Sequence, residues 1–381
     1  MKKKVLFTAT VVKTHIMEFH IPYLKLFRQL GWETAVAARN DYENPADCVI
    51  PFCDAYYEIP FARMPWKIQN LQAYRELKRL LEQEHYDLIH CHTPVGAMVT
   101  RLAARKARKQ GTRVVYTAHG FHFYKGAPLL NWLLFYPPEW LLAHITDVLV
   151  TINREDYAFA RKHLHAGRVE YVPGVGLDTD RFCPQGADPM EKRRELGLDP
   201  EDFVLLTVAE LTRNKNHTVV LKAIALLKDP VHYLICGGGA EQENLLQEAR
   251  ELGIEHQVHF LGYRRDVPEL CRCSDLFLFL SRREGLPVAL MEAMGCGLPA
   301  VCSRIRGNTD LVEDGVSGVF ADSNPQAVAG AISGLRENSE LRHRLGRGAR
   351  EAVMAFDSGK LLEKMKEIYL STAETAGEEE I

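Results

Sequence analysis

The sequence predicts an α/β protein in which two Rossmann-like domains follow one another, each with a parallel sheet covered by helices. Short runs rich in Val, Ile, Leu and Phe alternate with amphipathic stretches along the chain, and this alternation is typical of βαβ units. It pauses at residues 171–182, where Pro, Gly and Asp are typical of a linker, and then restarts. The length of 381 residues also suits about two domains.

The predicted elements follow from these runs in order. In the first half, apolar runs predict strands at residues 5–9, 34–38, 87–91, 113–117 and 147–152, with helical periodicity at 68–84 and 95–109. In the second half, strands are predicted at 203–208, 231–236, 258–261, 276–280 and 299–302, and helices at 217–228, 241–252, 287–296 and 326–336.

These elements divide the chain into four parts. We expect a first domain at residues 1–172, a linker and the start of the second domain at 173–199, and a second domain at 200–355. Residues 356–381 would form a C-terminal helix, which could cross back to the first domain, and an acidic tail.

Composition excludes several classes of protein. Hydrophobic residues make up 46% of the chain, too many for intrinsic disorder, and a net charge of −3 argues against a nucleic-acid binder. The start, MKKKVLFTATVVKTH, has too short an apolar run for a signal peptide. The nine cysteines form no CxxC pair, which favours reduced thiols and argues against zinc. We therefore expect a cytoplasmic protein.

The distribution of charge distinguishes the two halves. Residues 1–180 carry 23 Lys+Arg and 18 Asp+Glu, a balance of +5, whereas residues 181–381 carry 24 and 32, a balance of −8. Different surface charges favour different partners for the two domains. Neither half has GxGxxG after its first strand, which argues against a dinucleotide dehydrogenase. Two sheets that face each other would place ligands in a central cleft, beyond the carboxyl ends of the strands.

The segment at residues 280–301, LSRREGLPVALMEAMGCGLPAV, carries the most specific motif. Glu284 follows a predicted strand, and Pro287 suits the first position of a helix whose N-terminus favours an anion. Glu292 would lie roughly 7 Å further along that helix. Its carboxylate could accept hydrogen bonds from a ribose while Glu284 holds sugar hydroxyls. The alternative is a capped surface helix with acidic residues in its first turns.

The spacing Glu284-x7-Glu292, followed by Ala-Met and then Gly-Leu-Pro-Ala-Val, resembles the retaining glycosyltransferases of family 4. These enzymes have the GT-B fold, two Rossmann-like domains around a cleft. The resemblance implies that Glu284 contacts the donor sugar, a catalytic role, and that Glu292 binds the ribose of a nucleotide sugar. It also implies that Gly285, Leu286 and Pro287 line the diphosphate and the sugar.

Three further segments of the second half resemble donor-binding segments of the same family. Residues 205–217, LLTVAELTRNKNH, resemble its phosphate-binding stretch, in which Lys215 would neutralise the diphosphate. Glu210 stands where the family usually has an Arg, and Arg213 could supply that charge. Without the resemblance, Arg213 and Lys215 are ordinary solvated loop charges. Gly238, in a glycine turn, would border the donor site. Arg264 would lie in the stretch whose backbone contacts the base of the nucleotide.

In the first half, the resemblance assigns a catalytic contact to His119, which follows the strand predicted at 113–117. This histidine would touch the donor sugar or its leaving phosphate. Lys13, His15 and His92 are candidate acceptor contacts, with solvated or structural roles as the alternative. His90 and His122 are interpreted as structural.

A metal is not expected. Asp178-Thr179-Asp180 has the Asp-x-Asp pattern that binds a divalent ion in other glycosyltransferases, but it falls in the predicted linker, where Asp residues form turns. No cofactor is expected either, because the nucleotide sugar is a substrate.

A membrane contact is suggested by two neighbouring segments. Residues 101–113 hold six cations, and the tract that follows contains Trp132 and Trp140, a combination that suits an anionic membrane surface. A solvated helix face beside a core helix is the alternative. Interrupted by two prolines, the apolar tract at 129–142 is too short to span a bilayer.

The sequence of residues 117–140 resembles that of family members that build capsular and exopolysaccharide units on undecaprenyl-diphosphate carriers at the inner face of the cell membrane. The resemblance implies retaining transfer of an N-acetylhexosamine from UDP-GlcNAc or UDP-GalNAc to an undecaprenyl-diphosphate-linked or other saccharide acceptor. The alternatives are a UDP-sugar 2-epimerase on the same fold and a catalytically silent glycosyltransferase subunit.

Overall fold

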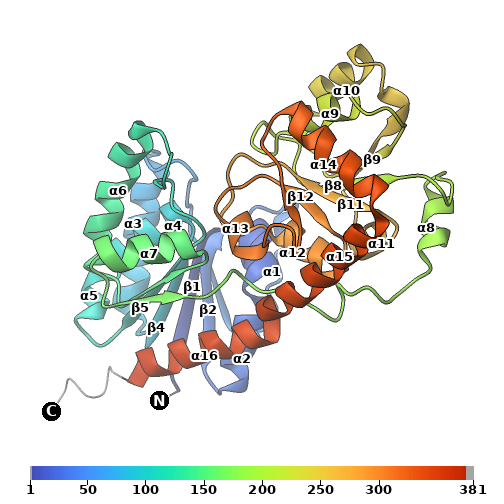
Figure 1. Cartoon of the computed structure of the whole chain (residues 1–381). Helices are drawn as coiled ribbons and strands as arrows, with labels where there is room; N and C mark the ends of the chain where they lie inside the picture. The colour runs from blue at the N-terminus through green and yellow to red at the C-terminus, as the bar shows by residue number, and fades with distance from the viewer. Residues whose placement is uncertain (1, 375–381) are drawn as a thin grey trace. The chain divides into compact units, whose positions relative to one another are not determined.

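The computed structural model describes residues 2–374, and these form two compact units (Figure 1). Unit 1 takes the chain up to Val175 and again from Leu361, and unit 2 takes Gly176–Lys360. The chain therefore leaves unit 1 within the segment predicted as a linker and returns to it with its last helix.

Unit 1 contains a parallel sheet of seven strands in the order β3-β2-β1-β4-β5-β6-β7. The order reverses direction between β1 and β4, and such a switch point leaves a crevice at the carboxyl ends of the two strands. The strands are β1 Lys4–Val11, β2 Glu33–Arg39, β3 Ala55–Glu58, β4 Leu88–His92, β5 Arg113–Ala118, β6 Val148–Thr151 and β7 Arg168–Tyr171.

Helices cover both faces of this sheet because side chains of successive strand residues point to opposite faces. In β1, Leu6 belongs to one buried cluster with α3 and α4, whereas Val5 and Phe7 belong to another with α2 and α16. The longer helices are α2 Ile21–Gln29, α3 Gln69–Gln83, α4 Pro94–Ala103, α6 Leu129–Ala143, α7 Arg154–His163 and α16 Ser358–Glu374. Short turns are η1 Val12–Ile16, α1 Met17–Phe19, η2 Pro45–Asp47 and α5 Arg105–Arg108.

The C-terminal helix α16, whose partner the sequence left open, packs on the sheet of unit 1. Met365 and Tyr369 are buried in the cluster that contains Val5 and Phe7. The Tyr369 hydroxyl lies 2.7 Å from Nδ1 of His90, and His90 Nε2 lies 2.8 Å from the hydroxyl of Thr117. His90 is therefore a structural histidine with both nitrogens bonded.

Unit 2 repeats the design with six parallel strands in the order β10-β9-β8-β11-β12-β13, and its switch point lies between β8 and β11. The strands are β8 Val204–Val208, β9 His232–Cys236, β10 Val258–Gly262, β11 Leu276–Phe279, β12 Ala300–Cys302 and β13 Val319–Phe320. The helices are α8 Pro189–Glu195, α9 His217–Ile224, α10 Gln242–Glu251, α11 Val267–Arg272, α12 Val288–Gly295, α13 Asn308–Leu311, α14 Pro325–Glu337 and α15 Ser339–Val353, with turns η3 Glu255–Gln257 and η4 Met354–Phe356.

The predicted fold class is confirmed by these two sheets, and the predicted strands all form. Three strands that the sequence analysis missed, β3, β7 and β13, each lie at the end of a sheet. Their residues are half-buried or exposed, so their sequences contain no continuous apolar run. Among the described residues, no helix has the length and apolar character needed to span a membrane.

Candidate functional site

The switch point of unit 2 brings together Lys215 and Glu284, two residues predicted to act on the donor. Lys215 follows β8 and Glu284 follows β11, and these strands are neighbours in the sheet. The Lys215 ammonium lies 2.7 Å from Oε1 of Glu284, with the two side chains 21% and 12% exposed. The loops are also joined by their backbones, because Arg282 N–H donates to the Asn214 carbonyl at 2.8 Å.

The other acidic residue, Glu292, lies on α12 and is half-buried. Burial raises the pKa of its carboxyl to about 7, although the positive charge of Arg181 acts in the opposite direction. No hydrogen bond to this carboxyl is seen from any described residue, so it can receive a ligand without breaking a contact. The prediction that Pro287 is the first helical residue is wrong by one position: Pro287 is the N-cap with ψ of 115°, and the helix begins at Val288.

The loop of Gly285, Leu286 and Pro287 connects β11 to this helix. Gly307 approaches it so closely that a Cβ at that position would lie 2.6 Å from the Gly285 carbonyl oxygen. Leu286 is buried. The close approach of Gly307 therefore restricts the backbone of this loop at the start of α12.

The remaining predicted donor contacts are less well placed for a ligand. Arg213 is 86% exposed and lies 3.3 Å from Glu241. Arg264 makes a two-point contact with Asp266 at 2.8 and 2.5 Å and also reaches Glu195. Gly238 has open space around it. These arginines would have to exchange their carboxylate partners before they could bind a nucleotide.

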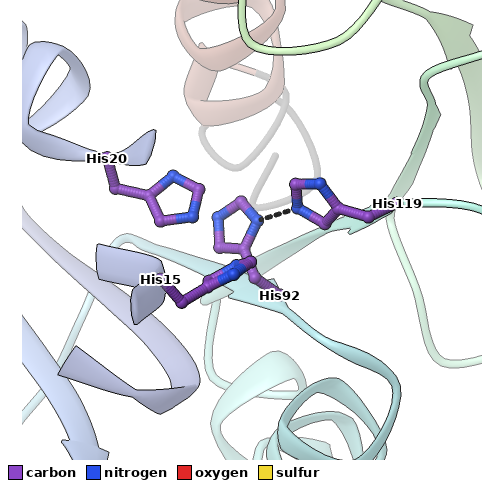
Figure 2. Close-up of side chains that lie close together, drawn as sticks. All are labelled: His15, His20, His92 and His119. Carbon is purple, nitrogen blue, oxygen red and sulfur yellow. Dashed lines mark hydrogen bonds between the residues drawn. The ribbon is translucent and has the colours of Figure 1, made fainter. Parts of the chain in front are cut away.

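The switch point of unit 1 gathers four histidines, which we call the histidine cluster: His15, His20, His92 and His119 (Figure 2). His15 lies in η1 after β1, His92 ends β4, and His119 follows β5. One nitrogen from each ring lies within 4.8 Å of the others. His20 and His92 are buried, whereas His15 and His119 are partly exposed. The structure thus brings together three predicted site residues and adds His20.

Burial keeps these rings neutral. It lowers the pKa of His15 to about 3, with a further contribution from neighbouring His119, and lowers that of His119 to about 4. The pKa values of His20 and His92 fall well below the ordinary value for the same reason, and neighbouring imidazoles add to the effect. Four neutral imidazoles offer lone pairs and N–H donors but no positive charge.

Several other predicted residues lie outside the cluster. Lys13 is exposed, with its ammonium 5.5 Å from the ring centre of Tyr42. His122 stacks on Phe135 with ring centres 4.7 Å apart. The turn interpretation of the Asp-x-Asp motif is confirmed, because the Asp178 carboxylate accepts hydrogen bonds from the backbone N–H groups of Asp180 and Arg181.

A cavity of about 530 Å³ lies in unit 1 next to the histidine cluster and is lined mainly by apolar side chains. Trp66, Phe121, Phe123 and Leu134 contribute to its wall, and His15 reaches it. Beside it, α6 exposes a row of large apolar residues: Leu129 at 74%, Leu130 at 62%, Leu133 at 65%, Leu134 at 55% and Leu141 at 62%. Exposed apolar residues that lie together in this way are typical of surfaces that bind a partner.

The basic segment at residues 101–113 is less available than its sequence predicts. Arg101 is fully buried and makes a two-point contact with Glu139 of α6 at 2.6 and 3.2 Å. Arg108 and Arg113 both lie close to Asp147, at 2.7 and 3.7 Å. Three of the six cations are therefore paired with partly buried carboxylates, and Lys106 contacts the more exposed Glu82 at 3.5 Å.

The sequence analysis missed His20 and Glu139 as functional or positioning residues. His20 is five positions after His15, and only the π-helical turn η1 together with α1 brings the two rings within 5.0 Å of each other. Glu139 looked like an interruption of an apolar tract, because its partner Arg101 lies 38 residues earlier. The local sequence pattern therefore predicts neither the position of His20 in the cluster nor the pairing of Glu139.

Comparison with known proteins identifies a family for each of the two units. The family described as "Glycosyltransferase Family 4" matches residues 23–181, and the family described as "Glycosyl transferases group 1" matches residues 189–352. The chain is 40% identical over 375 residues to the "Putative glycosyltransferase EpsD" of Bacillus subtilis (strain 168), covering 97% of both proteins.

Two more distant relatives extend the comparison. An Escherichia coli protein named UDP-Gal:alpha-D-GlcNAc-diphosphoundecaprenol alpha-1,3-galactosyltransferase is 27% identical over 312 residues, which is 80% of each chain. The crystal structure of the Anabaena protein HepE in complex with UDP and glucose has a TM-score of 0.81 at 22% identity, covering 97% of this chain and 100% of the other.

Proposed function

The chain belongs to the GT-B glycosyltransferases, and we propose that it transfers a sugar from a UDP-sugar to a lipid-linked saccharide acceptor in the assembly of a surface polysaccharide. The observation that carries this proposal is the arrangement at the switch point of unit 2, where Lys215 pairs with Glu284 at 2.7 Å. Glu292, free of hydrogen bonds from described residues, follows on the next helix.

On the donor side, each of these groups has a distinct task. When the donor binds, the Lys215 ammonium leaves Glu284 and contacts the diphosphate. It then neutralises the negative charge that develops on the diphosphate as its bond to the sugar breaks. Released from Lys215, Glu284 accepts hydrogen bonds from the sugar hydroxyls. Glu292 accepts from the ribose, and the loop of Gly285, Leu286 and Pro287 lies along the diphosphate. Arg213, Gly238 and Arg264 flank the site at its edge.

For the transfer step, we propose that an N-acetylhexosamine moves with retention of configuration. The acceptor hydroxyl attacks the anomeric carbon on the face that the diphosphate leaves, and the departing phosphate oxygen takes the proton of that hydroxyl. The bond to the diphosphate breaks as the bond to the acceptor forms, so UDP is released and no enzyme nucleophile is needed. The protein contributes position and charge stabilisation, with His119 at the donor sugar or leaving phosphate and with no metal in this step.

The acceptor proposal rests on unit 1. The 530 Å³ apolar cavity and the exposed leucines of α6 suit the prenyl chain of a lipid carrier, and the name of the E. coli relative specifies an acceptor on diphosphoundecaprenol. Lys13, His15 and His92 would lie near its polar part. Peripheral contact with an anionic membrane surface would depend mainly on the leucines, with Arg105, Lys106 and Lys109 as the exposed cations.

The test is UDP release from a panel of UDP-sugars, with and without an undecaprenyl-diphosphate-linked saccharide. We expect release to require the acceptor and to be fastest with UDP-GlcNAc or UDP-GalNAc. Lys215→Met should slow the transfer about 100-fold because a group that stabilises the leaving diphosphate is lost. Lys222→Met, a change of a half-exposed lysine on α9 that pairs with Glu248, is the control and should leave the rate unchanged.

Three outcomes would contradict the proposal. Conversion of UDP-GlcNAc without release of UDP would favour the 2-epimerase. Tight binding of a UDP-sugar without turnover on any acceptor would favour a silent subunit. An unchanged rate in Lys215→Met would remove the proposed donor site.

A further inference from the structure

Several ring nitrogens of the histidine cluster have no hydrogen-bond partner among the described residues. Four of its nitrogen atoms are buried with no hydrogen-bond partner there: Nε2 of His15, both nitrogens of His20, and Nε2 of His92. Between the rings, His92 Nδ1 and His119 Nε2 are 3.4 Å apart, which is long for a hydrogen bond. Buried polar atoms in native proteins nearly always have a partner, so these nitrogens are available to bind an occupant other than protein.

The space available limits the size of this occupant. His20, His92 and His119 line a small cavity of about 10 Å³, which is the room of roughly one water molecule or one ion. A sugar or a phosphate group does not fit there. The candidates are therefore a single water and a single metal ion.

The chemistry of the donors favours a metal ion. One nitrogen of each of the four rings lies within 4.8 Å of the other three, so four imidazole donors converge on one small region. A set made only of imidazoles suits Zn²⁺ and other transition metals, whereas Mg²⁺ and Ca²⁺ prefer oxygen.

We propose that unit 1 binds one Zn²⁺ ion through His15, His20, His92 and His119. The spacing already present supports this: tetrahedral Zn²⁺ with bonds of about 2.0–2.1 Å places its ligand nitrogens about 3.3 Å apart. His92 Nδ1 and His119 Nε2 are 3.4 Å apart. The cluster as a whole spans up to 4.8 Å, so the other rings need only side-chain rotation to close around the ion. Figure 2 shows the ring of His92 between those of His20 and His119, with His15 next to it.

This ion would stabilise structure because four protein ligands leave no open position. It would join η1 and α1, which carry His15 and lead to His20, to the ends of β4 and β5. When Nε2 of His119 binds the ion, the proton of that ring stays on Nδ1. The ring then presents a fixed N–H donor for an oxygen of the substrate. The proposal goes beyond the transferase function, and Zn²⁺ binding is measurable without donor or acceptor.

The experiment uses the full chain, purified without a metal-affinity tag and dialysed against a chelator. Calorimetric titration with Zn²⁺ and elemental analysis should both give one ion per chain. Co²⁺ in place of Zn²⁺ should show the visible absorption of a tetrahedral site. X-ray absorption at the zinc edge should show nitrogen neighbours at about 2.0–2.1 Å.

Matched variants then locate the ion. His20→Gln and His92→Gln should each weaken Zn²⁺ binding by at least about 100-fold, and Zn²⁺ should no longer raise the unfolding temperature. His85→Gln changes an exposed histidine of the same unit and should bind Zn²⁺ as the wild type does. The wild-type stoichiometry and Co²⁺ spectrum remain decisive if a variant does not fold.

The proposal is overturned if the wild-type chain binds less than one ion, if the Co²⁺ spectrum is octahedral, or if all three variants bind Zn²⁺ equally. None of these results bears on UDP release, so failure of the zinc site and failure of the transferase proposal are distinguishable.

Discussion

At the residue scale, Glu292 combines a cost in stability with the binding role proposed for it. Burial holds the pKa of its carboxyl at about 7, above the ordinary 4.5. Between these pH values the folded chain keeps a proton that the unfolded chain releases. Stability therefore falls as pH rises from 4.5 to 7. A residue that lowers stability in this way is typical of a functional site.

We expect Glu292→Gln to be more stable than the wild type by about 1–3 kcal/mol above pH 7. The two proteins should be equal near pH 4.5, because the wild-type carboxyl is then also neutral. Urea unfolding at both pH values measures this. The same variant should bind the UDP-sugar about tenfold less tightly, since a charged acceptor is lost. Glu243→Gln, at an exposed position of α10, should show neither effect, and a variant less stable at both pH values would contradict the argument.

The contact between Lys215 and Glu284 differs from a surface ion pair. Both side chains are largely buried, whereas Arg213 in the neighbouring contact with Glu241 is 86% exposed. A double-mutant cycle of Lys215→Met and Glu284→Gln should give a coupling free energy of about 1–3 kcal/mol in chemical unfolding. The matched cycle of Arg213→Met and Glu241→Gln should give below about 1 kcal/mol. Equal couplings would mean that the buried pair has no special structural role.

At the scale of the element, a buried ion pair connects α6 to α4. The helix contains Pro137 and Pro138 in its interior, and each proline removes a backbone hydrogen bond of the helix. Its outward residues are exposed leucines. Arg101 of α4, fully buried over the ring of Tyr116, binds Glu139 and connects the two helices.

Glu139→Ala should therefore destabilise the protein by about 3–5 kcal/mol, because it leaves the Arg101 charge buried and unpaired. Hydrogen exchange should show the largest loss of protection in α6. Glu82→Ala removes the partner of Lys106 in an exposed pair and should change stability by less than about 0.5 kcal/mol. Similar effects of the two changes would refute a structural role for the buried pair.

At the scale of the whole molecule, unit 1 is completed by the last helix of the chain. Tyr369 is fully buried against β1 and α2 residues, although the whole of unit 2 lies between them in the sequence. Tyr369→Ala should cost about 3–5 kcal/mol. It should lower hydrogen-exchange protection in β1 and β4 but leave β8 and β11 unchanged. Tyr263→Ala, at a residue 83% exposed, is the control, and loss of protection in both sheets would contradict two separately packed units.

Local sequence patterns are sufficient to predict the central strands, because fully buried strands such as β11 and β12 are continuous apolar runs. They also predict that Glu284 and Lys215 follow strand ends, since that depends only on strand boundaries. The edge strands β3, β7 and β13 were missed because their half-exposed sequences resemble loops.

What local patterns cannot show is which strand ends are neighbours. Strand order places β1 beside β4 and β8 beside β11, and this order alone brings His15 to His92 and Lys215 to Glu284. The same holds for Arg101 with Glu139 and for His90 with Tyr369. Sequence thus determined the α/β class, the two domains and the motif that marks the family. The partners of each side chain, and with them the histidine cluster and the buried ion pairs, were decided by tertiary packing, because they join segments whose separation carries no periodic signal.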